Sequence, residues 1–366
     1  MPALSPELSL AAFEFKGTTV PTSSHTARPL IETFPPQRVL AVDDLSVAFR
    51  SGDATVNAVR HLSFTVERGE TLAIVGESGS GKSVTSLALM RLIEHGGGRL
   101  AGGGIAFRRR DGSVLDLAKA SSGTMRSIRG ADIAMIFQEP MTSLNPVHTV
   151  GQQIVEAILA HTTMSPRAAK ARAIEMLELV RIPSPAQRID DYPHNMSGGM
   201  RQRVMIAMAL SCEPSLLIAD EPTTALDVTI QAQILDLLSD LQQRLGMAIL
   251  IITHDLGVIA EVADEVLVMY AGRIVESADV NDLFVDPQHP YTIGLLGSIP
   301  RIDVDRERLA TIEGTVPSPN NQPKGCRFAP RCPFADLRCR QQPPPFRDIA
   351  PGHQVACWKA PVEVTS

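Results

Sequence analysis

Residues 70–83 read ETLAIVGESGSGKS, an apolar run that passes into a glycine-rich turn and then a Lys-Ser pair. Residues 70–75 predict a buried strand, and a helical pattern over about 82–94 follows the turn. A glycine-rich turn in this position lets backbone N–H groups close around phosphate oxygens at the positive end of a helix. The alternative, a turn with a solvated lysine, is disfavoured because residues 76–83 fit G-x-x-x-x-G-K-[ST] between a strand and a helix.

This loop also predicts which residues bind a nucleoside triphosphate. We expect Lys82 to reach the β- and γ-phosphates and the Ser83 hydroxyl to ligate Mg²⁺. The expected contacts to ATP within the loop are Gly76, Ser78, Gly79, Ser80, Gly81, Lys82, Ser83 and Val84.

Two further apolar runs, 215–220 and 247–253, predict buried strands that each end in polar residues. Such strands alternating with helical patterns are typical of a parallel sheet, and ligands bind at the carboxyl ends of its strands. We expect Asp220 to hold Mg²⁺ there and Glu221 to polarise water. An isolated acidic pair is more often a helix cap or a solvated loop, but its occurrence together with the phosphate loop favours the catalytic interpretation.

Residues 138–191 predict a helical insert between these strands, in which Ser165 and Pro166 fit the N-cap and first position of a helix. A second glycine-rich turn precedes the helical run 201–211. An ordinary serine N-cap would explain it, but a hydroxyl and flexible N–H groups at a helix start also form an anion site. One chain has little use for two such sites, so the second indicates two domains facing each other head to tail with nucleotide between them. Its residues are Ser197, Gly198 and Gly199.

The placement of proline predicts the domain boundaries. Of the 27 prolines, 6 lie before Arg38 and 13 lie in residues 286–366, which leaves 8 for the residues between. We expect a flexible tail over 1–37, an α/β nucleotide-binding domain over 38–285 with a helical subdomain at about 139–212, and a C-terminal extension over 286–366. No internal repeat is evident, so one nucleotide-binding unit is expected.

Composition excludes several classes of protein. The net charge of −6 disfavours a general nucleic-acid binder. No apolar run approaches the roughly 18 residues that cross a bilayer, and Glu7 and Glu14 interrupt any signal peptide. We therefore expect a chain that stays in a reducing compartment, where its five cysteines are thiols or metal ligands.

Four of these cysteines lie in the extension, separated by five, six and seventeen residues: Cys326, Cys332, Cys339 and Cys357. The tight pairs usual in zinc sites do not occur. Four thiolates suffice for a [4Fe-4S] cluster, and six basic residues against one acid over residues 324–347 would offset its negative charge. Zinc and free thiols remain alternatives. The phosphate loop is distant from these cysteines in sequence and is expected to lie in a separate domain, whereas Cys212 is expected to be a buried hydrophobic residue.

The set of motifs resembles the ATP-binding-cassette (ABC) ATPases over residues 38 to about 285. The resemblance implies that Gln138 links the helical subdomain to the γ-phosphate and metal, and that His254 contacts the γ-phosphate. It implies that Asp227, in the loop 225–227, touches an opposite subunit. It also implies that Phe49 stacks on adenine, although a core position would explain that residue equally simply.

Residues 197–210 and 137–146 look like the subgroup that serves dipeptide, oligopeptide and nickel importers, with Met200 where most of the family has Gln. Residues 288–292 and 313–317 and the cysteine segment resemble that subgroup's C-terminal appendix. The resemblance implies an ATPase subunit, peripheral on the cytoplasmic face of a bacterial inner membrane. Its implied partners are a second, related ATPase, two transmembrane permeases and an extracytoplasmic solute-binding protein.

Two other functions are alternatives to a transport ATPase. A soluble cassette ATPase of DNA repair or translation would usually carry coiled-coil insertions or two tandem cassettes, and neither occurs. An iron–sulfur sensor regulated by nucleotide is disfavoured by the complete hydrolytic set. The transported solute stays open among dipeptides, longer peptides, nickel chelates and glutathione-like molecules, because its recognition would lie in other chains.

Overall fold

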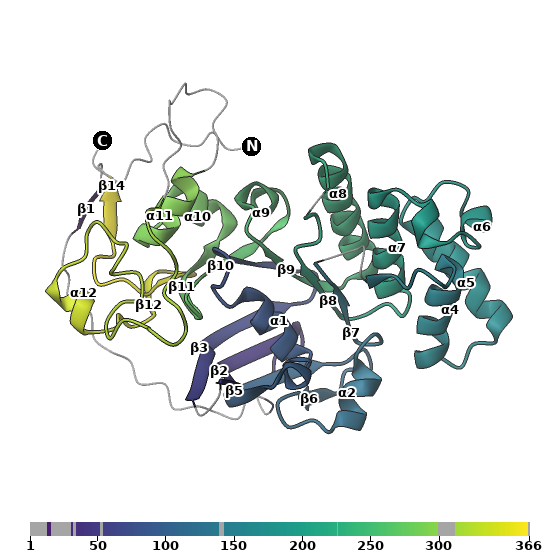
Figure 1. Ribbon diagram of the computed structural model, residues 1–366, viewed down its shortest axis with the longest axis horizontal. Helices are drawn as coiled ribbons and strands as arrows, with labels where there is room; N and C mark the ends of the chain where they lie inside the picture. Colours follow the sequence, from purple (N-terminus) through teal and green to yellow (C-terminus); the bar gives the residue numbers. More distant parts are fainter. Residues whose placement is uncertain are drawn as a thin grey trace.

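The computed structural model describes residues 13–15, 31, 34–51, 54–138, 143–224, 226–298 and 312–364. It is an α/β structure with a central sheet, a smaller antiparallel sheet beside it, and helices gathered at one end (Figure 1). The predicted tail lies almost entirely outside the described residues. Within it, β1 (Phe13–Phe15) pairs antiparallel with β14 (Val362–Val364).

The central sheet has the strand order β12-β13-β11-β10-β4-β9-β8-β7. The five strands from β10 to β7 are parallel, and β11, β13 and β12 continue the sheet antiparallel. Their bounds are β4 Thr71–Val75, β7 Ile133–Ile136, β8 Leu216–Asp220, β9 Ala248–Thr253, β10 Glu265–Tyr270, β11 Arg273–Asp279, β12 Arg347–Ala350 and β13 His353–Val355. The three strands predicted from apolar runs are therefore present, each beginning one residue later than expected.

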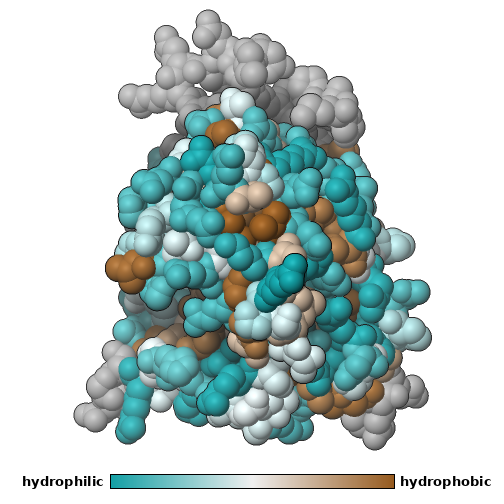
Figure 2. All heavy atoms as spheres, turned by 90° about the vertical axis from the view of Figure 1, so that its right-hand side faces the viewer, coloured by the Kyte–Doolittle hydropathy of each residue, from teal (hydrophilic) through white to brown (hydrophobic). Residues whose placement is uncertain are grey.

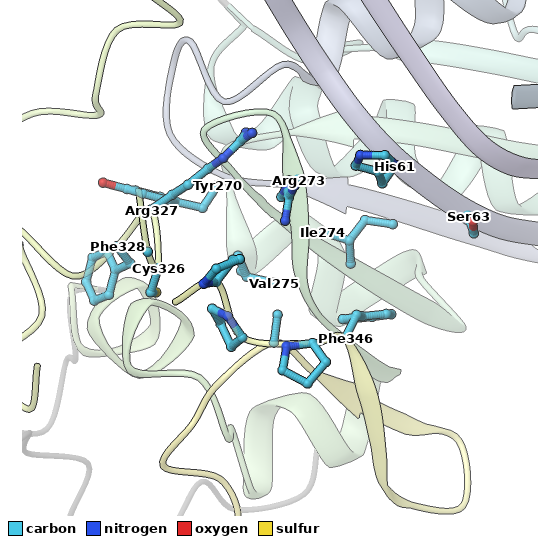
Figure 3. A pocket seen from close by; sticks show the side chains of 15 residues that line it. His61, Ser63, Tyr270, Arg273, Ile274, Val275, Cys326, Arg327, Phe328 and Phe346 are labelled. Atoms are coloured by element: carbon cyan, nitrogen blue, oxygen red, sulfur yellow. The ribbon is translucent and has the colours of Figure 1, made fainter. Parts of the chain in front are cut away.

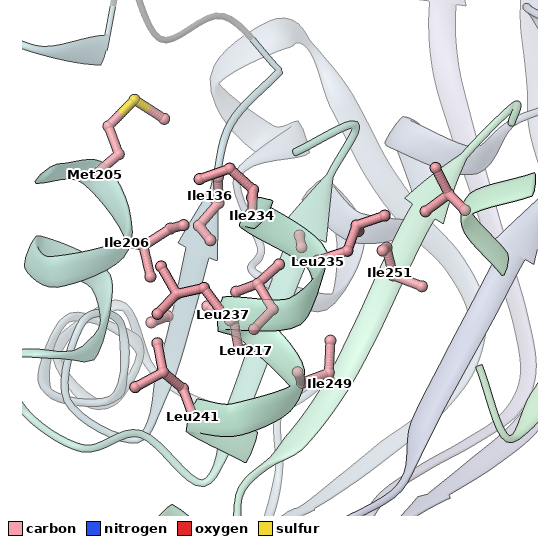
Figure 4. Close-up of a cluster of buried hydrophobic side chains, with 14 of the residues drawn as sticks. Ile136, Met205, Ile206, Leu217, Ile234, Leu235, Leu237, Leu241, Ile249 and Ile251 are labelled. Atoms are coloured by element: carbon pink, nitrogen blue, oxygen red, sulfur yellow. The ribbon is translucent and has the colours of Figure 1, made fainter. Parts of the chain in front are cut away.

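Strands β4, β8 and β9 form because both faces of this part of the sheet are buried. Alternate residues point to opposite faces, so Ala73 and Val75 of β4 join one core while Leu72 and Ile74 join the other. Figure 4 shows the first core, where side chains of β7, β8 and β9 meet those of α7 and α8 around Leu217. The second core lies between the central sheet and the antiparallel sheet, whose order is β3-β2-β5-β6. Its strands are β2 Arg38–Ser51, β3 Ala54–Glu67, β5 Gly98–Arg108 and β6 Val114–Asp116.

The helices near the nucleotide loop differ from expectation in one respect. Helix α1 (Lys82–Leu89) ends before the predicted residue 94, because Arg91 adopts φ +53°, which an α-helix cannot continue. A short 3₁₀ turn, Ile93–Gly96, follows. The other helices around the sheets are α2 Ser122–Ile128, α8 Val228–Leu245, α9 Leu256–Val262 and α10 Val280–Val285.

The predicted helical insert forms the right-hand end of the molecule in Figure 1. As expected, Ser165 caps α5, accepting a hydrogen bond from the Ala168 N–H, and Pro166 occupies the first turn. Its elements are α4 Val150–His161, α5 Pro166–Leu179, α6 Pro185–Arg188, the 3₁₀ turn Pro193–Asn195 and α7 Gly198–Leu210. Hydrophilic side chains cover most of this end, with hydrophobic ones scattered among them (Figure 2). Among the described residues, no helix combines the length and apolar character needed to span a bilayer.

The C-terminal extension packs against the opposite end of the central sheet (Figure 1). Its strand β13 pairs with β11, so two of its strands prolong the same sheet that carries the phosphate loop. Its helices are α11 Pro290–Gly297 and α12 Leu337–Gln341. A cavity of about 300 Å³ lies at this junction, between Tyr270, Arg273 and the extension (Figure 3).

Candidate active site

The phosphate loop joins β4 to α1 and depends on glycine. Gly76, Gly79 and Gly81 have φ of +149°, +78° and +104°, values that other residues rarely adopt. A Cβ at Gly76 would collide with the carbonyl of Met269 in β10. The loop can therefore wrap closely enough for its N–H groups to face a phosphate.

Lys82 lies within this loop. Its Nζ donates to the carbonyls of Gly76 (2.6 Å) and Glu77 (3.2 Å), and the side chain is buried. Burial lowers the pKa of Lys82, while the carboxylates of Glu221, Asp220 and Glu77 act in the opposite direction. The contact of this ammonium group with the β- and γ-phosphates stays a prediction.

The predicted magnesium ligands are adjacent. The Ser83 hydroxyl donates to Asp220 Oδ1 and the Ser86 hydroxyl to Asp220 Oδ2, both at 3.2 Å. Burial raises the pKa of Asp220, and these two hydrogen bonds oppose that shift. A hydroxyl beside a carboxylate at the carboxyl end of β8 is an oxygen donor set of the kind that Mg²⁺ prefers.

Glu221 is the centre of a cluster of polar side chains. Its carboxylate accepts hydrogen bonds from Gln138 Nε2 (2.8 Å) and Thr224 Oγ1 (2.9 Å), and His254 Nδ1 lies 3.3 Å from it. Three of the predicted residues thus meet at one point, together with Thr224, which the sequence reasoning did not single out. Residues 139–142, which follow Gln138 in the predicted motif, lie outside the described residues.

These groups line one cavity of about 720 Å³. Its lining includes residues of the phosphate loop with Lys82, and the cluster of Gln138, Glu221 and His254. The extension contributes Leu295, Ser298 and Ile312. A triphosphate with its metal could therefore lie between the ammonium group of Lys82 and the carboxylate of Glu221.

The second predicted anion site does not line this cavity. Ser197 caps α7, accepting from the Met200 N–H at 3.3 Å, and a Cβ at Gly199 would lie 2.8 Å from Ile230 of α8. Asp227 caps α8 by accepting from the Ile230 N–H, while Ala225 in the same loop lies outside the described residues.

Phe49 also lies apart from the cavity, among hydrophobic residues of the second core. A Cβ at Gly98 would lie 2.7 Å from its ring. Its predicted contact with adenine therefore stays a prediction.

Sequence reasoning missed the contacts between the extension and the phosphate loop. Arg331 forms an ion pair with Glu77, and the Glu77 N–H donates to the Tyr291 hydroxyl. The extension therefore contacts the phosphate loop, although the two are distant in sequence. Glu77 occupies an unspecified position of the loop motif, and Arg331 is one of several basic residues in its segment, so spacing gives no signal for the pair.

The four extension cysteines lie within electrostatic reach of one another. Burial raises the pKa of Cys332 to about 11 and that of Cys357 to about 12, and neighbouring cysteines add to both shifts. The Cys326 N–H donates to the carbonyl of Cys339 at 2.8 Å. Across the described ranges, however, no group of three or more His, Cys, Asp or Glu side chains could hold a metal ion. The structure therefore gives no support to a metal centre beyond bringing these thiols near one another.

The fifth cysteine, Cys212, is buried after α7, as predicted, and burial raises its pKa.

Comparison with known proteins gives two family matches. The family described as "ABC transporter" matches residues 59–224, and "Oligopeptide/dipeptide transporter, C-terminal region" matches residues 275–339. The chain is 52% identical to the dipeptide transport ATP-binding protein DppD of Bacillus subtilis, over 88% of this chain and 95% of that protein. It is 54% identical to a probable peptide ABC transporter ATP-binding protein of Sinorhizobium fredii, over 88% of this chain and 95% of that protein.

A third relative is longer than this chain. The glutathione import ATP-binding protein GsiA of Pectobacterium atrosepticum is 64% identical over 73% of this chain, but the match spans 43% of that protein. Among solved structures, cbiO1 from Clostridium perfringens, part of the ABC transporter complex cbiONQ, has a TM-score of 0.57 at 28% identity, over 68% of this chain and 91% of that one. The ATP-binding cassette MJ0796, a dimer bound to ADP and Pi, has a TM-score of 0.57 at 23% identity, over 66% of this chain and 98% of that one. This similarity supports the fold alone.

Proposed function

This chain belongs to the ABC transporter family of ATP-binding proteins, and from that premise we propose that it is the ATP-hydrolysing subunit of a peptide importer. The observation that carries the proposal is the meeting of Gln138, Thr224 and His254 at the carboxylate of Glu221, in the cavity that the phosphate loop also lines. The peptide assignment rests on the C-terminal region and on relatives named for dipeptide and oligopeptide transport.

In this proposal the loop N–H groups and Lys82 hold the β- and γ-phosphates. Ser83 and Asp220 would hold Mg²⁺ together with Gln138, and the bound ion would neutralise charge on the phosphate oxygens. Glu221 orients a water and accepts its proton as the water attacks the γ-phosphorus, and ADP leaves with the bridging oxygen. His254, next to Glu221, donates to the γ-phosphate and helps to hold the attacked group in line.

A head-to-tail pair of cassettes completes the proposed site. Ser197, Gly198 and Gly199 lie at the N-terminus of α7 and outside their own chain's cavity. In this proposal they bind the γ-phosphate of a neighbouring chain's nucleotide. Asp227 lies at the start of α8, where it would contact that neighbour. We take the neighbour to be a second, related ATPase, although two identical chains would satisfy the same geometry.

The remaining partners follow from the transporter assignment. Two transmembrane permeases would carry the solute, and an extracytoplasmic protein would deliver it. The ATPase would then sit peripherally on the cytoplasmic face of the membrane. Peptides are the proposed solutes, with glutathione-like molecules included because of the similarity to the longer relative. We also propose that the nucleotide-binding domain spans residues 38–285, with a helical subdomain at about 139–212, and that the C-terminal extension begins at residue 286.

We further propose that the four extension cysteines hold a [4Fe-4S] cluster with a structural role. Support comes from their electrostatic coupling and from the basic residues around them. A single ion needs its ligands about 2.3 Å away, whereas a four-iron cluster offers each thiolate its own iron and suits more widely spaced thiols. Protein purified without oxygen should be brown and contain iron and sulfide in about equal amounts, and Cys332→Ser should lose both. Colourless protein with stoichiometric zinc would reject the cluster.

Co-purification tests the assignment as a whole. Full-length chain produced at native level should be recovered with integral membrane proteins, and its ATP turnover should rise when the permeases and peptide-loaded binding protein are supplied in proteoliposomes. A soluble ATPase or a nucleotide-regulated sensor would be recovered without membrane proteins, and that result would reject the transport role.

A further inference from the structure

The cysteine segment of the extension directly contacts the phosphate loop. Arg331, which precedes Cys332, forms a two-point ion pair with Glu77: Nη1 lies 2.5 Å from Oε2 and Nη2 lies 2.9 Å from Oε1. The two residues are 254 positions apart in the sequence. The Arg331 side chain is only 4% exposed and that of Glu77 is 30% exposed, so the pair is partly sheltered from solvent.

Arg331 is itself rigidly held. Its remaining donors reach the backbone carbonyls of Ile312 (3.0 Å) and Glu313 (2.9 Å). Its guanidinium also lies near the rings of Tyr270 and Phe328. Figure 3 shows Tyr270 of β10 beside Phe328 and Cys326 of the extension, so the cysteine segment packs onto the strand next to β4.

A second contact holds the same loop residue by its backbone. The Glu77 N–H donates to the hydroxyl of Tyr291 in α11 at 2.8 Å, and the Tyr291 ring packs on Tyr270 with 4.6 Å between centroids. The extension therefore fixes both the side chain and the N–H of Glu77. That N–H points at α11 and leaves phosphate binding to the other N–H groups of the loop.

The ion pair between Arg331 and Glu77 should affect nucleotide binding because Glu77 is negatively charged. It is the only acidic residue between Gly76 and Lys82, it lines the same cavity as Lys82, and its charge opposes the lowering of the Lys82 pKa by burial. A carboxylate at this range would also repel the phosphates that Lys82 binds. The Arg331 guanidinium offsets that charge from a fixed position.

We propose that Arg331 is a positioning residue of the nucleotide site, which neutralises Glu77 and so makes the C-terminal extension a determinant of ATP affinity. The inference rests on the proposed ATP site, and it adds a regulatory consequence. Any change that disorders the cysteine segment releases Arg331 and lowers the affinity of a loop that lies in a different part of the chain.

ATP affinity of the full-length chain, measured by calorimetry, tests the inference. Arg331→Ala should weaken binding by about tenfold or more, because an unpaired charge several ångströms from the phosphates costs at least that much at a partly buried site. Arg340→Ala removes an equally basic but exposed side chain of the same extension and should bind ATP as the unchanged protein does. Arg331→Lys keeps the charge without the two-point pairing and should fall between them.

The decisive variant removes the charge at both ends. Glu77→Gln in the Arg331→Ala background leaves no carboxylate to offset, so most of the lost affinity should return. In the assembled transporter, Arg331→Ala should raise the KM for ATP and leave kcat nearly unchanged.

Unchanged affinity in Arg331→Ala would overturn the inference. So would a double variant that binds ATP as weakly as Arg331→Ala, because the pair would then act only by holding the extension in place. Failure of the unsubstituted chain to bind ATP would instead reject the proposed function.

Discussion

Glu221 meets its three neighbours from a backbone conformation that few residues adopt. Its φ is +49°, in the left-handed region, and its N–H donates to the carbonyl of Ile252 in the adjacent strand β9. Such a conformation costs about 1–3 kcal/mol and persists where the surrounding structure enforces it. Here it directs the carboxylate toward Gln138 and His254, which is consistent with a catalytic role.

Glu221→Gln is therefore expected to separate binding from hydrolysis. The amide keeps the shape but cannot take a proton, so ATP should still bind while turnover falls by at least about two orders of magnitude. Lys82→Ala should instead weaken ATP binding itself. Both variants are measured for affinity and for hydrolysis in the assembled transporter, and near-normal turnover of Glu221→Gln would exclude it from the catalytic role.

Individual residues were predictable where a local motif specifies them. Lys82, Ser83, Asp220 and Glu221 follow from short patterns at strand ends. In the structure Lys82 and Glu221 line one cavity, and Ser83 and Asp220 are hydrogen-bonded to each other. The pair of Arg331 and Glu77 could not be found this way, because a contact between residues 254 positions apart is created by the packing of the extension and has no local pattern.

At the level of elements, the sequence predicts strands well where burial on both faces forces a continuous apolar run. It predicts helix ends less well, since the end of α1 depends on one positive φ at Arg91. The sequence also gives no sign that the extension adds strands to the central sheet. Pairing of β13 with β11 joins only two residues of each strand, Glu276 with Val355 and Ser277 with Gln354, which is too short to be read from an alternating pattern.

The first core provides a stability prediction. Leu217 of β8 is fully buried among side chains of α7 and α8 (Figure 4), so Leu217→Ala should lower the free energy of unfolding by about 2–5 kcal/mol. Leu337→Ala removes the same atoms from a side chain that is 69% exposed, and its effect should stay within about 0.5 kcal/mol. Denaturant unfolding compares the two, and equal losses would contradict the assignment of Leu217 to the core.

Helix α11 predicts a pH dependence. His289 is its N-cap, accepting from the Tyr291 N–H through Nδ1, and burial lowers the pKa of His289 to about 3. Between the unfolded value near 6.5 and about 3, the unfolded chain binds a proton that the folded chain does not, so stability falls as the pH falls through this window.

His289→Asn tests that assignment, because an asparagine can cap the same N–H and does not titrate. Between pH 7 and pH 5.5 the unsubstituted protein should lose about 1 kcal/mol more of its free energy of unfolding than the variant loses. The other histidines are common to both proteins, so their titration cancels. Parallel pH profiles would show that His289 is not held neutral by burial.

For the whole molecule, the separation between the cavity and the N-terminus of α7 predicts how activity depends on assembly. Each chain holds the phosphate loop and Glu221, while its own Ser197 lies elsewhere. The isolated chain should therefore bind ATP but hydrolyse it poorly, and turnover should rise with assembly. Full turnover by a purified monomer, independent of concentration, would contradict the head-to-tail arrangement.

A matched pair of variants at Ser197 distinguishes a role in assembly from a role in folding. Aspartate and asparagine both cap helices well, so either should preserve the start of α7. Ser197→Asp adds a carboxylate that would face the γ-phosphate of a neighbouring chain, and it should lower the turnover of the assembled transporter by at least about tenfold. Ser197→Asn removes the same hydroxyl but adds no charge, so it should lower the turnover less than Ser197→Asp does. ATP affinity of the isolated chain should be the same for both, because Ser197 lies outside its own cavity. Weaker ATP binding by the isolated Ser197→Asp chain would place Ser197 at its own site and reject the two-chain arrangement.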